Sequence, residues 1–243
     1  MVKTLIALLI FVLPGFTGMR SPTSSSVDHL VCGSDAKLDN LGSFTVCGRH
    51  KPDAAAGDTN TLVDKDGWTV QRRATNGALG LVINNATTGY IYSYGATALP
   101  TTGFTQWCAT WDGTWNVNGI SIYFEGVADT AYSTGSSGAG PEQDDSAIDL
   151  WLGGRVDGVT SRGMDGNQEC VAIWNSVLTA DQIKSVAEGD CMMPTRIGTD
   201  PVALYLLQQG TVGAAYPNEP NVMGGTACTI AGSVTVVEGS IGH

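Results

Sequence analysis

Short runs of alternating apolar and polar residues, separated by turn residues, recur along most of the chain. Such alternation predicts β-strands with one buried face, and a spacing of roughly 8–12 residues is typical of a β-sandwich. The runs are 27–33, 43–48, 61–63, 68–72, 79–83, 90–94, 104–111 and 120–124. Asp-Gly pairs, which favour tight turns, stand at 66–67, 112–113, 157–158 and 165–166. The pattern predicts an all-β, antiparallel sandwich.

One segment has helical signals instead. Thr179 is a suitable N-cap, and Gln182 three residues later completes a capping box. Leu178 and Ile183 have the spacing of a hydrophobic staple, and Gly189 is placed to end the helix. The helix has only about two and a half turns, so it is too short to be stable alone. We expect it to dock on the strands that precede it.

Three parts of the chain differ in character. Residues 1–20 form an apolar N-terminal segment, residues 21–191 contain the strands and the helix, and residues 192–243 form a β-rich extension. At about 40–50 residues such an extension is marginal as an independent domain. We therefore expect it to dock on the sandwich or on a partner subunit.

The N-terminal segment has three interpretations. Basic and apolar residues in 1–13 resemble a secretory signal, and the apolar run is too short to span a bilayer comfortably. Residues 15–18 lack a clean cleavage site, and Met19 is a second possible start of translation. The segment could also be retained and pack against a neighbouring subunit. The sequence leaves all three open.

Composition narrows the class of protein. With 32 glycines and only 14% charged residues, the chain suits a turn-rich β protein, and 42% hydrophobic residues are enough for a sizeable core. The net charge of -11 and the lack of any basic run exclude nucleic acid as a partner, since phosphate binding needs clustered lysine and arginine. The acidity is compatible with cation binding and with plain solubility, and the solubility interpretation is favoured.

The six cysteines do not form a metal-binding pattern. Cys-x-x-Cys pairs are missing, and none of the three histidines lies at zinc-finger spacing from a cysteine. Cys32, Cys47, Cys108 and Cys170 lie inside strand-like segments. They are either buried thiols or members of disulfides, and a secretory signal would favour disulfides.

The order of the strand motifs resembles that of a known superfamily. In sequence, the motifs are Val31-Cys32-Gly33, Leu41 to Val46, Gln106 to Gly113, Ile122 to Gly126 and Leu150 to Gly154, followed by the strand–helix unit to Ile183. This succession resembles the laminin-G-like, concanavalin-A-like jelly-roll superfamily, and within it the branch related to pentraxins. The resemblance covers about 27–189. It implies a two-sheet antiparallel jelly-roll sandwich with one short helix after the penultimate strand block, and rim loops able to bind glycans, proteins or calcium.

The chain also departs from that superfamily. Its glycosidases carry alternating acidic residues along one strand, which serve as nucleophile and acid, and no strand here has that pattern. The acidic run Glu142 to Asp145 superficially resembles the pentraxin calcium loop, but it lies before the strand that ends at Leu152-Gly153. After that strand only Asp157 is acidic within the next four residues. We therefore expect a protein that is not an enzyme.

Candidate contact residues lie on the predicted rim loops. For a ligand these are Asp112, Trp115 and Arg162, where Trp115 either stacks on a sugar or folds back onto the sandwich. For calcium they are Asp157 and Asp165, although each precedes a glycine and the tight-turn interpretation is favoured.

Two further motifs have more than one interpretation. Tyr90, Tyr92 and Tyr94 alternate along one face of a strand, which is either buried, covered by a neighbour, or exposed and able to bind a glycan or partner. Asn85-Ala86-Thr87 is a glycosylation sequon with meaning only in a eukaryotic secretory context.

The sequence thus supports two hypotheses. The first is a non-catalytic recognition module that binds a glycan or glycoprotein through rim loops 112–118 and 157–165. The second is a structural subunit of a surface assembly, such as a virion decoration or fibre protein or an extracellular filament. In that case 1–20 and 192–243 would make subunit contacts in a homo-oligomer. Both place the protein outside the cell or on a surface.

Overall fold

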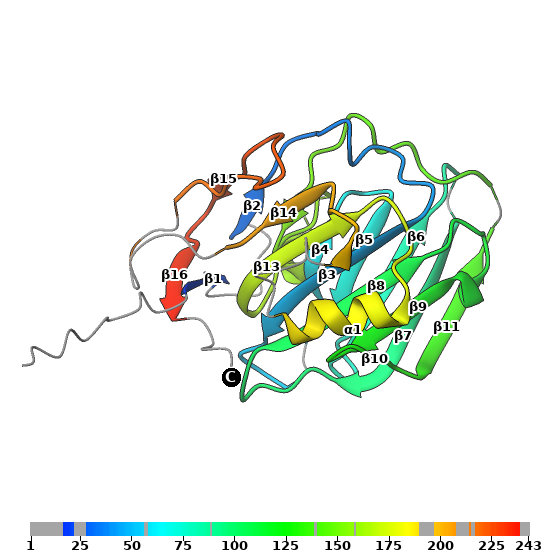
Figure 1. The fold of residues 1–243 in the computed structure, drawn as a ribbon, viewed down its shortest axis with the longest axis horizontal. Coiled ribbons are helices and arrows are strands. Elements are labelled where there is room, and N and C mark those ends of the chain that lie inside the picture. The colour runs from blue at the N-terminus through cyan, green and yellow to red at the C-terminus, as the bar shows by residue number, and fades with distance from the viewer. Residues whose placement is uncertain are drawn as a thin grey trace, which may run out of the picture.

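Two antiparallel β-sheets pack face to face in the computed structural model (Figure 1). The structure describes residues 17–21, 28–55, 58–87, 89–138, 140–157, 159–189, 197–207, 214 and 217–238. The predicted all-β sandwich with a single short α-helix is therefore confirmed within these residues. No helix among them is long and apolar enough to cross a bilayer.

The first sheet contains strands from both ends of the chain and from its middle. Its order is β10 (Val127–Ala128), β9 (Ile120–Phe124), β8 (Thr105–Trp111), β3 (Phe44–Lys51), β13 (Gly166–Trp174), β1 (Thr17–Ser21) and β16 (Thr235–Glu238). A short strand, β14 (Ala203–Tyr205), also pairs with β13. Every pairing in this sheet is antiparallel.

The second sheet contains most of the strands that the alternation predicts between residues 60 and 98. Its order is β11 (Ala131–Ser137), β7 (Tyr90–Ala98), β6 (Ala78–Asn84), β5 (Trp68–Arg72), β4 (Asn60–Asp64), β12 (Trp151–Leu152), β2 (His29–Val31) and β15 (Thr229–Ala231). The pairing places β12, which is distant in sequence, directly beside β4. The loop that follows β12 is thereby brought to the strands that form the candidate site.

The core lies between the two sheets and follows from the alternation. On β6, Leu79, Leu81 and Ile83 are fully buried, while the residues between them face outwards. Trp107 on β8 and Trp68 on β5 fill the same layer from opposite sheets. At about 25 cal/mol per Å² of apolar surface removed from water, this layer is the main source of stability. The opposite face of the second sheet does not belong to this core layer and carries the candidate site described below.

The α-helix covers the outer face of the first sheet. It spans Ala180–Glu188, labelled α1, and Figure 1 shows it lying across that sheet. Thr179 accepts a hydrogen bond from the Gln182 backbone, whose side chain in turn accepts one from the Thr179 backbone, so the predicted capping box is confirmed. Leu178 and Ile183 are both buried against the sheet beside Trp174.

Disulfides settle the question that the sequence left open for the cysteines. Cys47 on β3 and Cys108 on β8 form a disulfide at directly opposed positions under α1. Cys32 and Cys228 form a second one, which joins the ends of β2 and β15 across 196 residues. Cys170 is disulfide-bonded as well. Disulfides form and persist in oxidising compartments, so these bonds are consistent with a protein that is in an oxidising environment.

Both outer parts of the chain contribute strands to the sandwich. In the first sheet, β1 pairs with β13 and β16, and β14 pairs with β13. In the second sheet, β15 pairs with β2. Described strands from 1–20 and from 192–243 thus pair within this chain. The domain boundaries at 20 and 191 and the docking of the extension stay predictions. The signal hypothesis for 1–18 and the subunit-contact hypothesis for 1–20 and 192–243 also stay predictions, and residues 1–16 lie outside the described residues.

Candidate ligand-binding face

The outward residues of β5, β6 and β7 form rows across the second sheet. In one row Gln71, Gly80 and Tyr94 are neighbours, and in the next Thr69, Val82 and Tyr92 are neighbours. Because side chains alternate along a strand, the buried layer on one face of these strands leaves this set on the other. We call the surface formed by the outward residues of β5, β6 and β7 the tyrosine face.

Three tyrosines form a continuous stripe along β7. The ring centroids of Tyr90 and Tyr92 are 5.9 Å apart, and those of Tyr92 and Tyr94 are 5.4 Å apart in an edge-to-face arrangement. Tyr90 is 42% exposed, and the other two are half-buried. The sequence left open whether this stripe is buried, covered by a neighbour or exposed. In the structure it lies on the outer face of the second sheet and is partly exposed to solvent.

Glycines on the neighbouring strands make room for two of these rings. A Cβ atom on Gly80 of β6 would lie 2.2 Å from Cδ1 of Tyr94. A Cβ atom on Gly135 of β11 would lie 2.6 Å from Cε1 of Tyr92. The Tyr94 ring therefore lies over β6 and the Tyr92 ring over β11, each in space that a side chain at the glycine would fill.

Polar groups fix the inner end of the stripe. The Gln71 side-chain amide donates a hydrogen bond to the Tyr94 hydroxyl, and the guanidinium carbon of Arg73 lies 5.2 Å from the centre of the Tyr94 ring. Burial raises the pKa of Tyr94, so the phenol stays protonated at neutral pH. Arg73 also lies 5.9 Å from the ring centre of Tyr132 on the edge strand β11.

A buried aspartate ties the loop after β12 to this face. The Asp64 carboxylate accepts hydrogen bonds from the Thr69 hydroxyl at 2.6 Å and from the backbone N–H of Val156 at 2.9 Å. Desolvation raises the pKa of Asp64 to about 6, and its hydrogen bonds oppose that shift. Because Val156 is held in this way, the loop that continues through the 3-10 turn Thr160–Arg162, labelled η2, lies beside the sheet.

That loop brings two arginines to the tyrosine face. Arg155 forms an ion pair with Asp157 at 2.6 Å, and Asp157 also accepts a hydrogen bond from the Val159 backbone. Arg162 is exposed, and its charge favours the ionised form of Tyr94, which places it near that ring. Together with the sheet, the loop encloses a cavity of about 500 Å³. The cavity is lined by Thr59, Thr69, Gln71, Arg73, Ala74, Thr75, Val82, Asn84, Tyr90, Tyr92, Tyr94, Arg155 and Arg162.

Comparison with known proteins identifies the fold family. The sequence matches the Laminin_G_3 family, described as concanavalin A-like lectin/glucanases superfamily, over residues 24–184. The chain belongs to this superfamily. The resemblance inferred from the order of strand motifs is thereby confirmed. A comparison with curated protein sequences returned no significant match.

Solved structures of other proteins share the architecture. A native heptameric SAP-like pentraxin from Limulus polyphemus is 15% identical, with a TM-score of 0.59 over 92% of this chain and 95% of that chain. A protein from Bacteroides ovatus with the provisional name of carbohydrate binding protein is 17% identical, with a TM-score of 0.66 over 94% of this chain and 61% of that chain. At these identities the likeness concerns the fold.

Of the three residues that the sequence predicts for ligand contact, Arg162 lines the cavity. Asp112 and Trp115 lie in the β8–β9 loop instead, where Asp112 accepts hydrogen bonds from Thr114 within a turn. Trp115 packs against the core, and its indole N–H donates to the Gly138 carbonyl at 3.1 Å, as in the folded-back alternative. Ligand contact by Asp112 and Trp115 stays a prediction.

The two aspartates predicted for calcium have other partners. Asp157 is engaged with Arg155 and Val159, and the charge of Asp165 acts on Arg72, which is buried inside the sandwich. Calcium needs six to eight oxygen ligands, and within the described ranges no three acidic, histidine or cysteine side chains are grouped to hold a metal. Asp157 and Asp165 are therefore not part of such a group among the described residues, and calcium binding by them stays a prediction.

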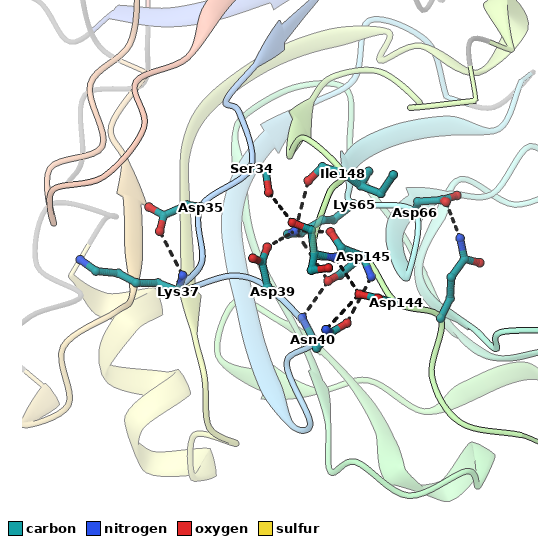
Figure 2. A network of polar contacts seen from close by, with 12 residues as sticks. Ser34, Asp35, Lys37, Asp39, Asn40, Lys65, Asp66, Asp144, Asp145 and Ile148 are labelled. Atoms are coloured by element: carbon teal, nitrogen blue, oxygen red, sulfur yellow. Dashed lines mark hydrogen bonds and ion pairs between the residues drawn. The ribbon is translucent and has the colours of Figure 1, made fainter.

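The acidic run before β12 surrounds an internal cation. Figure 2 shows Lys65, whose ammonium group lies 2.9 Å from Asp39 Oδ1 and 2.9 Å from the backbone oxygen of Asp145. The Lys65 and Asp145 side chains are fully buried, with 3.7 Å between Nζ and Oδ1. Burial next to Asp145 raises the pKa of Glu142 to about 8. Lys65 thus offsets part of the negative charge of the cluster and anchors the loop.

The sequon also has a structural role. Asn85 is buried, and its side-chain oxygen accepts hydrogen bonds from the Thr87 backbone, the Thr87 hydroxyl and the Gly89 backbone. These contacts close the turn between β6 and β7. The amide that a glycan would modify is enclosed within that turn.

Sequence reasoning missed Gln71, Arg73 and Arg155. A signal for the first two was present, because Trp68, Val70 and Arg72 alternate with Thr69, Gln71 and Arg73, and this alternation places the second set on the face opposite the core. No comparable signal existed for Arg155, since its proximity depends on the pairing of β12 with β4.

Proposed function

We propose that this chain is a non-catalytic recognition module that binds a glycan on the tyrosine face. The observation that carries the proposal is the stripe Tyr90, Tyr92 and Tyr94 beside a cavity of about 500 Å³ lined with amide and guanidinium groups. Sugars present apolar C–H faces and polar hydroxyl rims. Flat aromatic rings suit the first, and the side chains of Gln71 and Asn84 suit the second.

Family membership and fold support the proposal. The chain matches a lectin/glucanase superfamily, and a structure with a TM-score of 0.66 comes from a protein with a provisional carbohydrate-binding name. The disulfides agree with a location outside the cell or on a surface, where glycans are displayed. In this proposal the ligand lies on a sheet face and not on the rim loop that carries Trp115.

Replacing Tyr92 with alanine tests the proposal. Loss of one stacking ring from the middle of the stripe is expected to weaken glycan binding at least tenfold, which corresponds to about 1.4 kcal/mol. Binding is measured on a glycan array and then by calorimetry with the best ligand. The matched control is Tyr123→Ala, which removes a half-buried tyrosine from β9 in the other sheet. Loss of binding in Trp115→Ala but not in Tyr92→Ala would move the site to the rim.

Gly80 allows a second test, in which none of the cavity-lining residues is itself substituted. In Gly80→Val the new side chain occupies the space of the Tyr94 ring and displaces it. We expect weaker glycan binding by several fold, and thermal unfolding checks that the variant is still folded at the temperature of the binding measurement. Gly103→Ala is the matched control, because nothing lies within 4 Å of a Cβ atom at that position. Unchanged binding in Gly80→Val would show that the ligand does not use the Tyr94 ring.

A further inference from the structure

Arginine side chains reach the tyrosine face from two distant parts of the chain. Arg73 directly follows β5, whereas Arg155 and Arg162 lie in the loop between β12 and β13. All three line the cavity, and no aspartate or glutamate does. The whole chain has 23 acidic against 12 basic residues and a net charge of -11. The charged residues that line this cavity are all arginines, whereas an average patch of this acidic protein would carry more aspartate and glutamate than lysine and arginine.

Nearby carboxylates cancel only part of this charge. Asp157 pairs with Arg155 and leaves that guanidinium neutralised but fixed in position. Asp64 is almost fully buried and is engaged with Thr69 and Val156. Within the part of the chain that the structure describes, neither Arg73 nor Arg162 has an acidic partner. These two guanidinium groups supply the uncompensated charge.

Some polar atoms of the cavity-lining residues have no hydrogen-bond partner among the described residues. Nη1 of Arg73 and Nε of Arg155 are buried donors without a hydrogen-bond partner among the described residues, and Oε1 of Gln71 is a buried acceptor in the same condition. Leaving a buried polar group unpaired costs about 1–3 kcal/mol. A ligand that accepts from the arginines and donates to Gln71 would recover part of that cost.

We propose that the tyrosine face binds an anionic glycan, with a carboxylate or sulfate group of the sugar held by Arg73 and Arg162 while the sugar ring lies on the tyrosines. This inference rests on the function proposed above and names its ligand class. A guanidinium keeps its charge at any physiological pH and presents paired N–H donors that match the two oxygens of such a group. Arg155, held by Asp157, acts as a positioning residue at the edge of the cavity.

The experiment compares sugars that differ only in charge. Tetragalacturonic acid, its fully methyl-esterified form and a sulfated heparin tetrasaccharide are titrated into the full chain by calorimetry. The acid is expected to bind at least tenfold more tightly than the ester. Raising the salt from 50 to 500 mM should weaken binding of the acid but not of the ester, because salt screens exposed charges.

Arg162→Gln and Arg73→Gln test whether the difference in affinity between acid and ester arises at the tyrosine face. Arg162→Gln is expected to weaken binding of the acid about tenfold and to leave the ester unchanged. Lys184→Gln is the matched control, because it removes one positive charge from α1 on the other sheet, where Lys184 is 66% exposed. Arg73→Gln should reproduce the Arg162→Gln result.

Each outcome bears on the proposal. Binding of the heparin tetrasaccharide alone, with the same Arg162 dependence, supports it and identifies the anion as a sulfate ester. Equal binding of acid and ester with no effect of Arg162→Gln overturns the inference but leaves glycan binding intact. Tyr92→Ala then separates the two proposals, since it should weaken binding of charged and neutral sugars alike. If no sugar binds in any arm, the proposed function itself is wrong.

Discussion

Replacing Lys65 with methionine is expected to lower the free energy of unfolding by about 3–5 kcal/mol, the usual cost of removing one partner from a buried ion pair. The substitution leaves the Asp145 carboxylate buried next to Asp39 with no cation, and it removes the donor to the backbone oxygens of Asp145 and Ile148. Urea denaturation at pH 7 measures the loss. The loop 142–150 then loses its buried ion pair with the β4–β5 turn and keeps the hydrogen bond from the Gln143 amide to Asp66 (Figure 2).

Two controls distinguish the buried charge from a general effect of losing a lysine. Lys184→Met on the exposed surface of α1 should change stability by less than about 0.5 kcal/mol. The Lys65→Met penalty should shrink towards pH 4, because desolvation raises the pKa of Asp145 and its protonation removes the unpaired charge. A small penalty at pH 7, or one that does not depend on pH, would contradict the assignment of Lys65 as the neutralising cation.

Acid is expected to destabilise the protein through His50, with a contribution of roughly 4 kcal/mol between pH 7 and pH 3. His50 on β3 is fully buried inside the sandwich, and desolvation together with the charge of Arg72 lowers its pKa to about 3. The unfolded chain binds a proton at this residue below pH 6.5, whereas the folded chain does so only near pH 3. Stability from the neutral imidazole is therefore complete above pH 6.5 and is lost as the pH falls towards 3.

The difference between wild type and His50→Gln isolates this contribution. Buried carboxyl groups act in the opposite direction, because the raised pKa values of Asp64 and Glu142 favour the folded state on acidification. Both proteins contain those groups, so subtraction removes them. Urea denaturation from pH 8 to pH 4 should show a difference in unfolding free energy that is constant above pH 7 and declines below it. A constant difference throughout would mean that His50 titrates normally in the folded protein.

Much of the fold could be predicted because its determinants are local. Alternation along strands such as Leu79–Ile83 reflects one buried face, and any pairing of the strands preserves it. The helix at Ala180–Glu188 depends on a cap at Thr179 and on apolar residues within two turns of it. The family could be inferred for the same reason, since the order of strand motifs is a property of the linear chain.

The candidate site was only partly predictable. Tyr90, Tyr92 and Tyr94 could be seen to share one face of a strand, but whether that face is buried depends on what packs over it. Arg162 was assigned to a rim loop, yet this loop reaches the tyrosine face because Asp64 holds Val156. The burial of Lys65 could not be predicted from the sequence either. The turn Asp64–Gly67 has the residues of a solvent-exposed turn, but a segment about 80 residues away in sequence covers it.

The sequence by itself determined the all-β sandwich, the capped helix and the superfamily, because each depends on periodicity, on spacing or on the order of motifs along the chain. Only the tertiary structure decided the disulfide partners and the position of the candidate site. Both require strands distant in sequence to pair, as β12 does with β4 and β15 does with β2. Such pairing is set by the packing of the whole core, and no local pattern encodes it.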